Sequence, residues 1–439
     1  MAQAGKKIIL LTVVFAVLLT CTGCLFGGSV SELYALPQLP VRYQELESRI
    51  NQLIAEGAEY AAPISGSNLQ PVQMVDLDSD GIEEALIFMR RSAEEKPLKI
   101  YIFRMEGDSY RQAALLEGSG SAIYSISYAD LTGDGRQEIL VGWRAGAENP
   151  ALTVYSLRGS EPELLLSTTY SRYIFDSQDR GFVLLRSGPE ERCIAESYEA
   201  AENGLLQVTS TARLSCTAAE LAGGRVIFGY LKNEVPALFV VSLSADGSEA
   251  MTDVLRWGED GLHNVTMSSA TGHTTENHPF RMLFPEDVDR DGITELPVPT
   301  GSAEESGDLV SWVSFDERGR RKITAETYHN RQDGWYMLLP EEWWGHIVVY
   351  RSEISTYETQ VTLFWKDEAG MRELLRVYAF SGENRELRAA RDGRFRLRTQ
   401  QNTVYAAQLL AEAEKLQLNE DMVRAQFNLI VTEWIGGEN

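Results

Sequence analysis

The chain has 439 residues, of which 44% are hydrophobic and 24% charged, and its formal net charge at pH 7 is −24. The ordinary hydrophobic fraction excludes a wholly disordered chain, and this length provides for one large core or two modest ones. The strong negative charge repels phosphate groups, so we expect no nucleic-acid partner.

Residues 1–23 have the features of a secretory signal peptide. Two lysines are followed by an apolar run, Ile8–Leu19, that is too short to span a bilayer. The run leads to Thr22-Gly23-Cys24, which resembles the lipobox of bacterial lipoproteins. The resemblance implies cleavage before Cys24, lipidation of that residue and a place on the extracytoplasmic face of the bacterial cell membrane. The alternative is an ordinary cleaved signal peptide and a secreted protein.

The next two segments predict a tether and a helix. Residues 24–40 contain Gly, Ser and Pro without strong periodicity, so we expect a tether. Residues 41–60 place apolar side chains at helical spacing, at Leu46, Ile50, Leu53 and Ile54, and therefore predict a helix.

Three acidic loops of one design occur further along the chain. Loop one is Asp76-Leu-Asp78-Ser-Asp80-Gly81-Ile-Glu-Glu84, loop two is Asp130-Leu-Thr132-Gly-Asp134-Gly135-Arg-Gln-Glu138, and loop three is Asp287-Val-Asp289-Arg-Asp291-Gly292-Ile-Thr-Glu295. Oxygen-bearing side chains at positions 1, 3 and 5 can converge on one hard cation, and Gly at position 6 permits a sharp turn. The loops therefore predict Ca²⁺ sites. Their expected ligands are Asp76, Asp78, Asp80, Glu84, Asp130, Thr132, Asp134, Glu138, Asp287, Asp289, Asp291 and Glu295.

These loops are not EF-hands, which need a Glu at position 12 and a helix on each side. Position 12 is Ile87, Val141 or Val298, and the flanking residues are typical of strands. The pattern resembles the FG-GAP (VCBS) repeats of integrin-like β-propellers, which implies that each loop joins the first two strands of a blade and holds Ca²⁺. Loop two departs from that pattern because Thr132 replaces the central carboxylate, so its site should be weaker. Asp-Gly turns that need no metal are the alternative.

The spacing of the loops predicts a repeated β architecture. Asp76 and Asp130 are 54 residues apart, and Asp130 and Asp287 are 157 apart, close to three intervals of about 52. We therefore expect a mainly β fold, a β-propeller of about six to seven four-stranded blades with its blades in residues 61–383. Two eroded blades should lie between loops two and three, near Phe175–Gly181 and Asn233-Glu234. A sixth unit should run from Trp335 to Phe380.

Residues 384–439 change in character and predict a small α-containing C-terminal appendage. Its expected helices are Thr403–Lys415 and Glu420–Trp434, with Asn419 as a cap for the second.

Secretion allows a disulfide between Cys193 and Cys216, but buried free thiols are the state that we expect.

Two functional hypotheses follow. The first is a lipid-anchored, Ca²⁺-binding propeller that acts as a binding or scaffold module, with envelope polysaccharide or protein as its partner. The alternative is a propeller enzyme, a lyase or glycosidase, that acts on envelope polysaccharide. Trp335, Trp343 and Trp344 can stack on a sugar in that case, although a role in the blade core is the expected one. Because the sequence contains no nucleophile elbow, zinc-protease motif or nucleotide-binding loop, we expect a binding module in preference to an enzyme.

Overall fold

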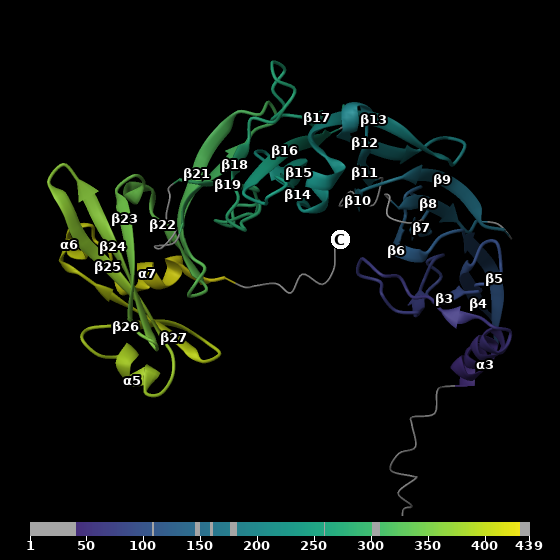
Figure 1. Cartoon of the computed structure of the whole chain (residues 1–439), viewed down its shortest axis with the longest axis horizontal. Helices are drawn as coiled ribbons and strands as arrows, with labels where there is room; N and C mark the ends of the chain where they lie inside the picture. Colours follow the sequence, from purple (N-terminus) through teal and green to yellow (C-terminus); the bar gives the residue numbers. More distant parts are fainter. Residues whose placement is uncertain are drawn as a thin grey trace, which may run out of the picture. The chain divides into compact units, whose positions relative to one another are not determined.

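The computed structural model describes residues 41–107, 109–144, 150–158, 161–175, 182–258, 260–300 and 308–430. Within these residues the fold is mainly β, and its strands form six antiparallel sheets that follow one another along the chain (Figure 1). Most of the strands in each sheet are consecutive and joined by hairpins, which is the topology of a propeller blade. The predicted fold class, mainly β with about six blade-like sheets, is confirmed.

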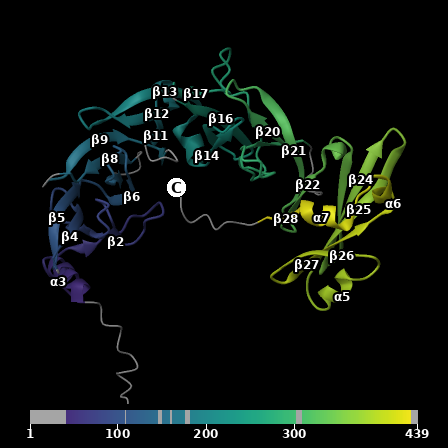
Figure 2. The same cartoon turned by 180° about the vertical axis from the view of Figure 1, so that it is seen from behind.

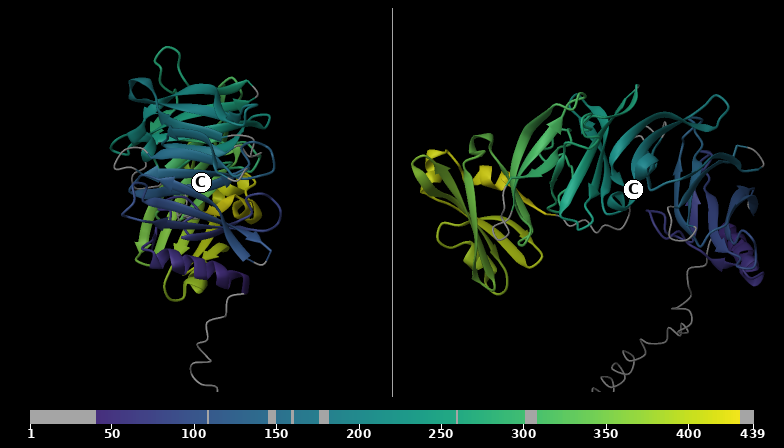
Figure 3. Two further views of the ribbon diagram at one scale, coloured as in Figure 1. Left: turned by 90° about the vertical axis from the view of Figure 1, so that its right-hand side faces the viewer. Right: turned by 45° about the horizontal axis from the view of Figure 1, so that its top comes forward.

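The described residues form two compact units, of which the smaller contains residues 41–58 and 104–111 apart from 108. Its described part holds helix α3 (Val41–Ala55), drawn in purple in Figure 3. Tyr43 of this helix stacks on Tyr110, with ring centroids 6.4 Å apart. The helix ends because Gly57 takes a φ of 91° and the Ala58 N–H donates to the Leu53 carbonyl at 3.0 Å. The helix predicted over residues 41–60 is therefore present but ends at Ala55.

The larger unit comprises Glu59–Phe103 and Gln112–Asn439. The first two sheets hold loops one and two. The first sheet contains β1 (Glu59–Tyr60), β2 (Val72–Val75), β3 (Glu84–Arg90), β4 (Leu98–Glu106) and β5 (Ser109–Gly118). The second contains β6 (Ala122–Ala129), β7 (Glu138–Arg144), β8 (Ala151–Ser156) and β9 (Glu163–Thr169).

The third and fourth sheets are the two eroded blades expected between loops two and three. The third contains β10 (Arg172–Phe175), β11 (Phe182–Ser187), β12 (Arg192–Ala200) and β13 (Leu206–Thr217), and helix α4 (Ala218–Ala222) follows it. The fourth contains β14 (Arg225–Leu231), β15 (Val235–Leu243), β16 (Glu249–Gly258), β17 (Gly261–Asn264) and β18 (Asn277–Pro279). Asn233 and Glu234 form the β14–β15 turn, whereas residues 176–181 of the other expected loop lie outside the described residues.

The fifth and sixth sheets complete the series. The fifth contains β19 (Leu296–Pro299), β20 (Asp308–Phe315), β21 (Arg321–Asn330), β22 (Trp335–Leu339) and β28 (Phe427–Leu429). The sixth contains β23 (Ile347–Ser355), β24 (Glu358–Asp367), β25 (Gly370–Phe380), β27 (Thr403–Leu409) and β26 (Phe395–Gln400). The expected sixth unit therefore begins too early, because Trp335–Leu339 pairs with β21 of the fifth sheet.

The C-terminal segment differs from the predicted pair of helices. It contains three short helices, α5 (Arg385–Ala389), α6 (Ala411–Lys415) and α7 (Glu420–Gln426), and the last is capped by Asn419 as expected. Thr403–Leu409 is a strand and not a helix, because its backbone pairs with β25 on one side and with β26 on the other. In Figure 2, α6 lies beside β25 of the sixth sheet, and β27 is itself a strand of that sheet. The segment thus supplies strands to two sheets.

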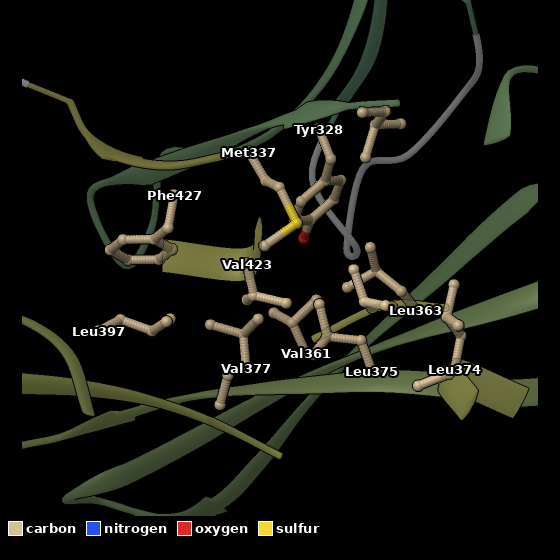
Figure 4. Packing of buried hydrophobic residues seen from close by; sticks show 14 of the residues in the cluster. Tyr328, Met337, Val361, Leu363, Leu374, Leu375, Val377, Leu397, Val423 and Phe427 are labelled. Carbon is tan, nitrogen blue, oxygen red and sulfur yellow. The ribbon is translucent and has the colours of Figure 1, made fainter. Parts of the chain in front are cut away.

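A large core cluster joins the fifth and sixth sheets. It is shown in Figure 4, where Tyr328 and Met337 of the fifth sheet face Val361, Leu363 and other apolar side chains of the sixth. Val423 of α7 and Phe427 of β28 lie in the same cluster. Trp335 and Trp343 are buried in it, so they are core residues and not a platform for a sugar. Cys193 and Cys216 are buried free thiols in another cluster.

One buried histidine should make the protein sensitive to acid. His329 lies between Trp312 and Tyr336, with ring centroids 6.1 and 4.9 Å away, and neither ring nitrogen has a hydrogen-bond partner in the described part of the chain. Burial is the main cause that lowers the pKa of His329 from 6.5 to about 3. The unfolded chain therefore binds more protons between these values, and stability falls as the pH drops below 6.5.

We expect His329→Phe to reduce this acid sensitivity. The loss attributable to His329 is about 1.4 kcal/mol per pH unit, or about 2 kcal/mol at pH 5. Urea unfolding of wild type and variant at pH 7.5 and pH 5.0 measures it. An equal loss of stability in both proteins would show that His329 is not the group responsible.

The predicted signal peptide, the tether and Cys24 lie outside the described residues. Within the described ranges, none of the helices has the length and apolar character needed to cross a membrane.

Candidate metal sites

The three acidic loops occupy the same place in three sheets. In each case the residue before the first aspartate pairs with the glutamate at position 9. These antiparallel pairs are Val75 with Glu84, Ala129 with Glu138, and Glu286 with Glu295. In the fifth sheet the pair is an isolated bridge, so the strand before loop three is reduced to Glu286. The prediction that these loops take equivalent positions in blade-like sheets is confirmed.

The backbone of each loop folds around the carboxylate at position 1. The N–H of the glycine at position 6 donates to this carboxylate at 2.9 Å in loop one, 2.8 Å in loop two and 3.0 Å in loop three. These glycines have φ angles of 85°, 83° and 88°, a left-handed region that other residues enter only with strain. Glycine at position 6 is therefore required by the turn, as the sequence pattern predicts.

The glutamate at position 9 is buried beneath each loop and is hydrogen-bonded to its backbone. Glu84, Glu138 and Glu295 are 1%, 0% and 0% exposed. Each accepts a hydrogen bond from the backbone N–H at loop position 2, at 2.9, 2.9 and 3.2 Å respectively. A buried carboxylate is unfavourable unless it is paired or binds a metal, so its repeated presence here favours a cation in the loop.

Carboxylate oxygens converge in loops one and three. In loop one, Asp76, Asp78 and Glu84 each offer an oxygen within 4.8 Å of the others, and in loop three Asp287, Asp289 and Asp291 do the same. Asp80 and Glu295 are outside these two groups. Oxygens gathered in this way fit Ca²⁺, which takes six to eight oxygen ligands at about 2.3–2.6 Å. One oxygen of Asp76, Oδ1, is buried and has no hydrogen-bond partner within the described residues, which also fits a metal ligand.

The electrostatics of loop three also favour a cation. Burial raises the pKa of Glu295 to about 8, and the charges of Asp289, Asp291 and Asp287 add to this effect. Burial, reinforced by Asp291, also raises the pKa of Asp289. A divalent cation among these groups would offset their repulsion and favour the ionised forms.

Loop two is different because an arginine contacts it. The carboxylates of Asp130, Asp134 and Glu138 do not form a convergent group in the described structure. Thr132 Oγ1 lies 3.5 Å from Glu138 Oε1. Arg158 Nε donates to Asp134 Oδ2 at 2.7 Å, a contact that the sequence did not indicate. Because Arg158 is 24 residues beyond Asp134, only the pairing of β7 with β8 brings the two together.

Hydrogen bonds link loops two and three to the sheets that precede them. The N–H of Gln137, at position 8 of loop two, donates to the Leu77 carbonyl in loop one at 2.8 Å. Ser79 Oγ of loop one donates to the Gly135 carbonyl at 2.5 Å. The N–H of Thr294, at position 8 of loop three, donates to the Tyr230 carbonyl of β14 at 2.8 Å. Loops two and three therefore each contact the preceding sheet as well as their own.

One cavity between the fourth and fifth sheets is too small to hold a sugar. This cavity, of about 20 Å³, is lined by His278, Phe280, Leu283 and neighbouring residues of the fourth and fifth sheets. That volume holds about one water molecule and not a sugar ring. Glu276 beside it already pairs with His278 at 2.9 Å.

Comparison with known families agrees with the loop geometry. Residues 76–141, which run from loop one into β7 after loop two, match the FG-GAP-like repeat family. This segment therefore has the sequence of an FG-GAP-like repeat, as its loops and strands indicate. No curated protein matches the chain significantly.

Two solved structures that are similar to this chain share little sequence with it. One is the periplasmic gluconolactonase PpgL of Pseudomonas aeruginosa, with 10% identity and a TM-score of 0.29, covering 73% of this chain and 95% of that one. Another is the Dos1 propeller, with 6% identity and a TM-score of 0.30, covering 62% of this chain and 64% of that one. Likeness at this level carries no argument about activity or partners.

Proposed function

We propose that this chain is a lipid-anchored, extracytoplasmic Ca²⁺-binding β-propeller that acts as a binding or scaffold module at the cell envelope. The observation that carries the proposal is the repeated geometry of the acidic loops. The same turn and the same buried glutamate recur in three sheets, and carboxylates converge in two of them. Such repetition favours a shared ligand, and oxygen donors at this density favour Ca²⁺.

The role of Ca²⁺ in this proposal is structural. In loop one the proposed ligands are Asp76, Asp78, Asp80 and Glu84, and in loop three they are Asp287, Asp289, Asp291 and Glu295. Loop two, with Asp130, Thr132, Asp134 and Glu138, is the weakest candidate because it lacks the central carboxylate. A bound ion would fix each loop at the corner of its sheet and, through the backbone bonds of Gln137 and Thr294, fix the preceding sheet as well.

The proposed location rests on the leader and on Cys24. A lipidated Cys24 would hold the propeller at the membrane, because each buried CH₂ of an acyl chain contributes about 0.8 kcal/mol. Envelope polysaccharide or protein would then be the partner within reach. A scaffold of successive antiparallel sheets suits contact with such extended partners.

We expect Cys24→Ala to release the protein from the membrane fraction or to leave the precursor unprocessed. The reason is that lipidation requires the cysteine thiol and precedes cleavage at a lipobox. Cell fractionation and intact-mass measurement of both proteins provide the test, with Cys193→Ala as the matched control that should stay in the membrane. Unchanged membrane attachment of a correctly cleaved Cys24→Ala protein would contradict lipid anchoring.

A further inference from the structure

The guanidinium group of Arg158 places a positive charge against loop two. Arg158 lies just beyond β8, and its guanidinium contacts the position-5 carboxylate of Asp134 at 2.7 Å. Arg158 therefore places a guanidinium charge directly against one of the expected metal ligands of loop two.

The strand register shows that this arginine is specific to loop two. The residue that follows the position-9 glutamate pairs with Phe103 in the first sheet, Tyr155 in the second and Val313 in the fifth. Three residues further along, the equivalent positions are Glu106, Arg158 and Asp316. The first and fifth sheets, which each hold a complete acidic loop, thus have an acidic residue at this position, Glu106 or Asp316. The second sheet, which holds the incomplete loop two, has the basic residue Arg158.

Loop two also has fewer negative charges than loops one and three. The oxygen donors expected in loops one and three include four carboxylates each, whereas loop two has three carboxylates and Thr132. Contact with Arg158 removes one more negative charge from the set in loop two. Because Ca²⁺ affinity depends on the number of charged ligands, loop two should bind the ion far more weakly than the other loops.

We propose that Arg158 is a built-in cation that takes the place of Ca²⁺ in loop two, so that the protein binds two Ca²⁺ ions and not three. The inference rests on the proposed Ca²⁺ function of loops one and three. It assigns Arg158 as the residue that determines which loops accept the metal. Loop two then keeps its turn, and its hydrogen bonds to Leu77 and Ser79, at any Ca²⁺ concentration.

The test is calorimetric titration of the full chain in detergent with CaCl₂. Wild type is expected to bind two ions per chain. Arg158→Gln should bind three, because Asp130, Asp134 and Glu138 lose their internal counter-charge, and Arg158→Lys, which keeps the charge, should bind two. Arg111→Gln is the matched control: it removes an arginine whose ion pair with Glu106 is exposed, and it should also bind two.

The outcomes separate this inference from the proposed function. A wild-type protein that binds no Ca²⁺ would overturn the Ca²⁺ function of the loops. A wild-type protein that binds three ions would overturn the role of Arg158 alone, and this measurement needs no variant to fold. Two ions in a folded Arg158→Gln protein, verified by its melting curve, would overturn it as well.

Discussion

Removing Ca²⁺ from the protein is expected to lower its melting temperature by several degrees. A ligand that binds only the folded state stabilises it by RT ln(1 + [L]/Kd), and sites with a Kd of about 0.1–1 mM contribute about 1.4–2.7 kcal/mol each at 10 mM Ca²⁺. Two such sites correspond to a shift on the order of 5 °C for a chain of this size. Differential scanning calorimetry in chelator and in 10 mM CaCl₂ measures the difference, and Mg²⁺ should have much less effect.

Substitutions in the loops should show how much each loop contributes to the rise in melting temperature on Ca²⁺ binding. Asp289→Asn removes a central carboxylate of loop three and should abolish about half of the Ca²⁺-dependent shift. Thr132→Ala should leave it almost unchanged, because the shift comes from loops one and three. Asp421→Asn is the matched control, since its side chain is 96% exposed and belongs to no loop. Equal melting temperatures in chelator and in Ca²⁺ for wild type would mean that the loops are turns that bind no metal.

Phe427→Ala should destabilise the protein by about 3–5 kcal/mol, the loss typical of a large aromatic side chain removed from a core. Phe427 is buried among Trp335, Tyr405 and neighbouring residues, with ring centroids 5.3 and 5.5 Å away for these two. Its strand β28 pairs with β22 of the fifth sheet. The loss would therefore show that the C-terminal segment is part of the main core. Urea unfolding monitored by tryptophan fluorescence is the measurement.

Met422→Ala provides the comparison for this experiment. Met422 lies on α7, five residues before Phe427, and its side chain is 39% exposed. Its removal should change the free energy of unfolding by less than about 1 kcal/mol. Similar effects of the two substitutions, or a Phe427→Ala protein as stable as wild type, would indicate that the segment contributes little to the core.

The features that the sequence predicted well are local in the chain. Each loop holds its proposed ligands within nine residues, so ligand spacing and the glycine at position 6 determine the turn directly. The intervals between loops likewise predict the number of sheets, because each sheet is made mostly of consecutive strands. Asn419 was identified as a helix cap for the same reason, since its side chain bonds the N–H of Met422 only three residues away.

The features that the sequence did not predict depend on distant contacts. Thr403–Leu409 contains residues that suit either a helix or a strand, and pairing with β25 decides in favour of the strand. The sequence pattern assigns Trp335–Leu339 to the following unit, because periodicity does not show which neighbour a strand pairs with. Arg158 reaches Asp134 only through the hairpin of β7 and β8. A comparison of equivalent positions in the three loop-bearing sheets is the signal that would have found it.

Anomalous X-ray diffraction from crystals grown in CaCl₂ would test the central claim most directly. The prediction is one strong anomalous peak among Asp76, Asp78 and Glu84, a second among Asp287, Asp289 and Asp291, and none in loop two beside Arg158. Crystals soaked in chelator should lose both peaks. Well-ordered loops one and three without any anomalous peak in 10 mM Ca²⁺ would contradict the account, because oxygens arranged as these are would then hold no metal.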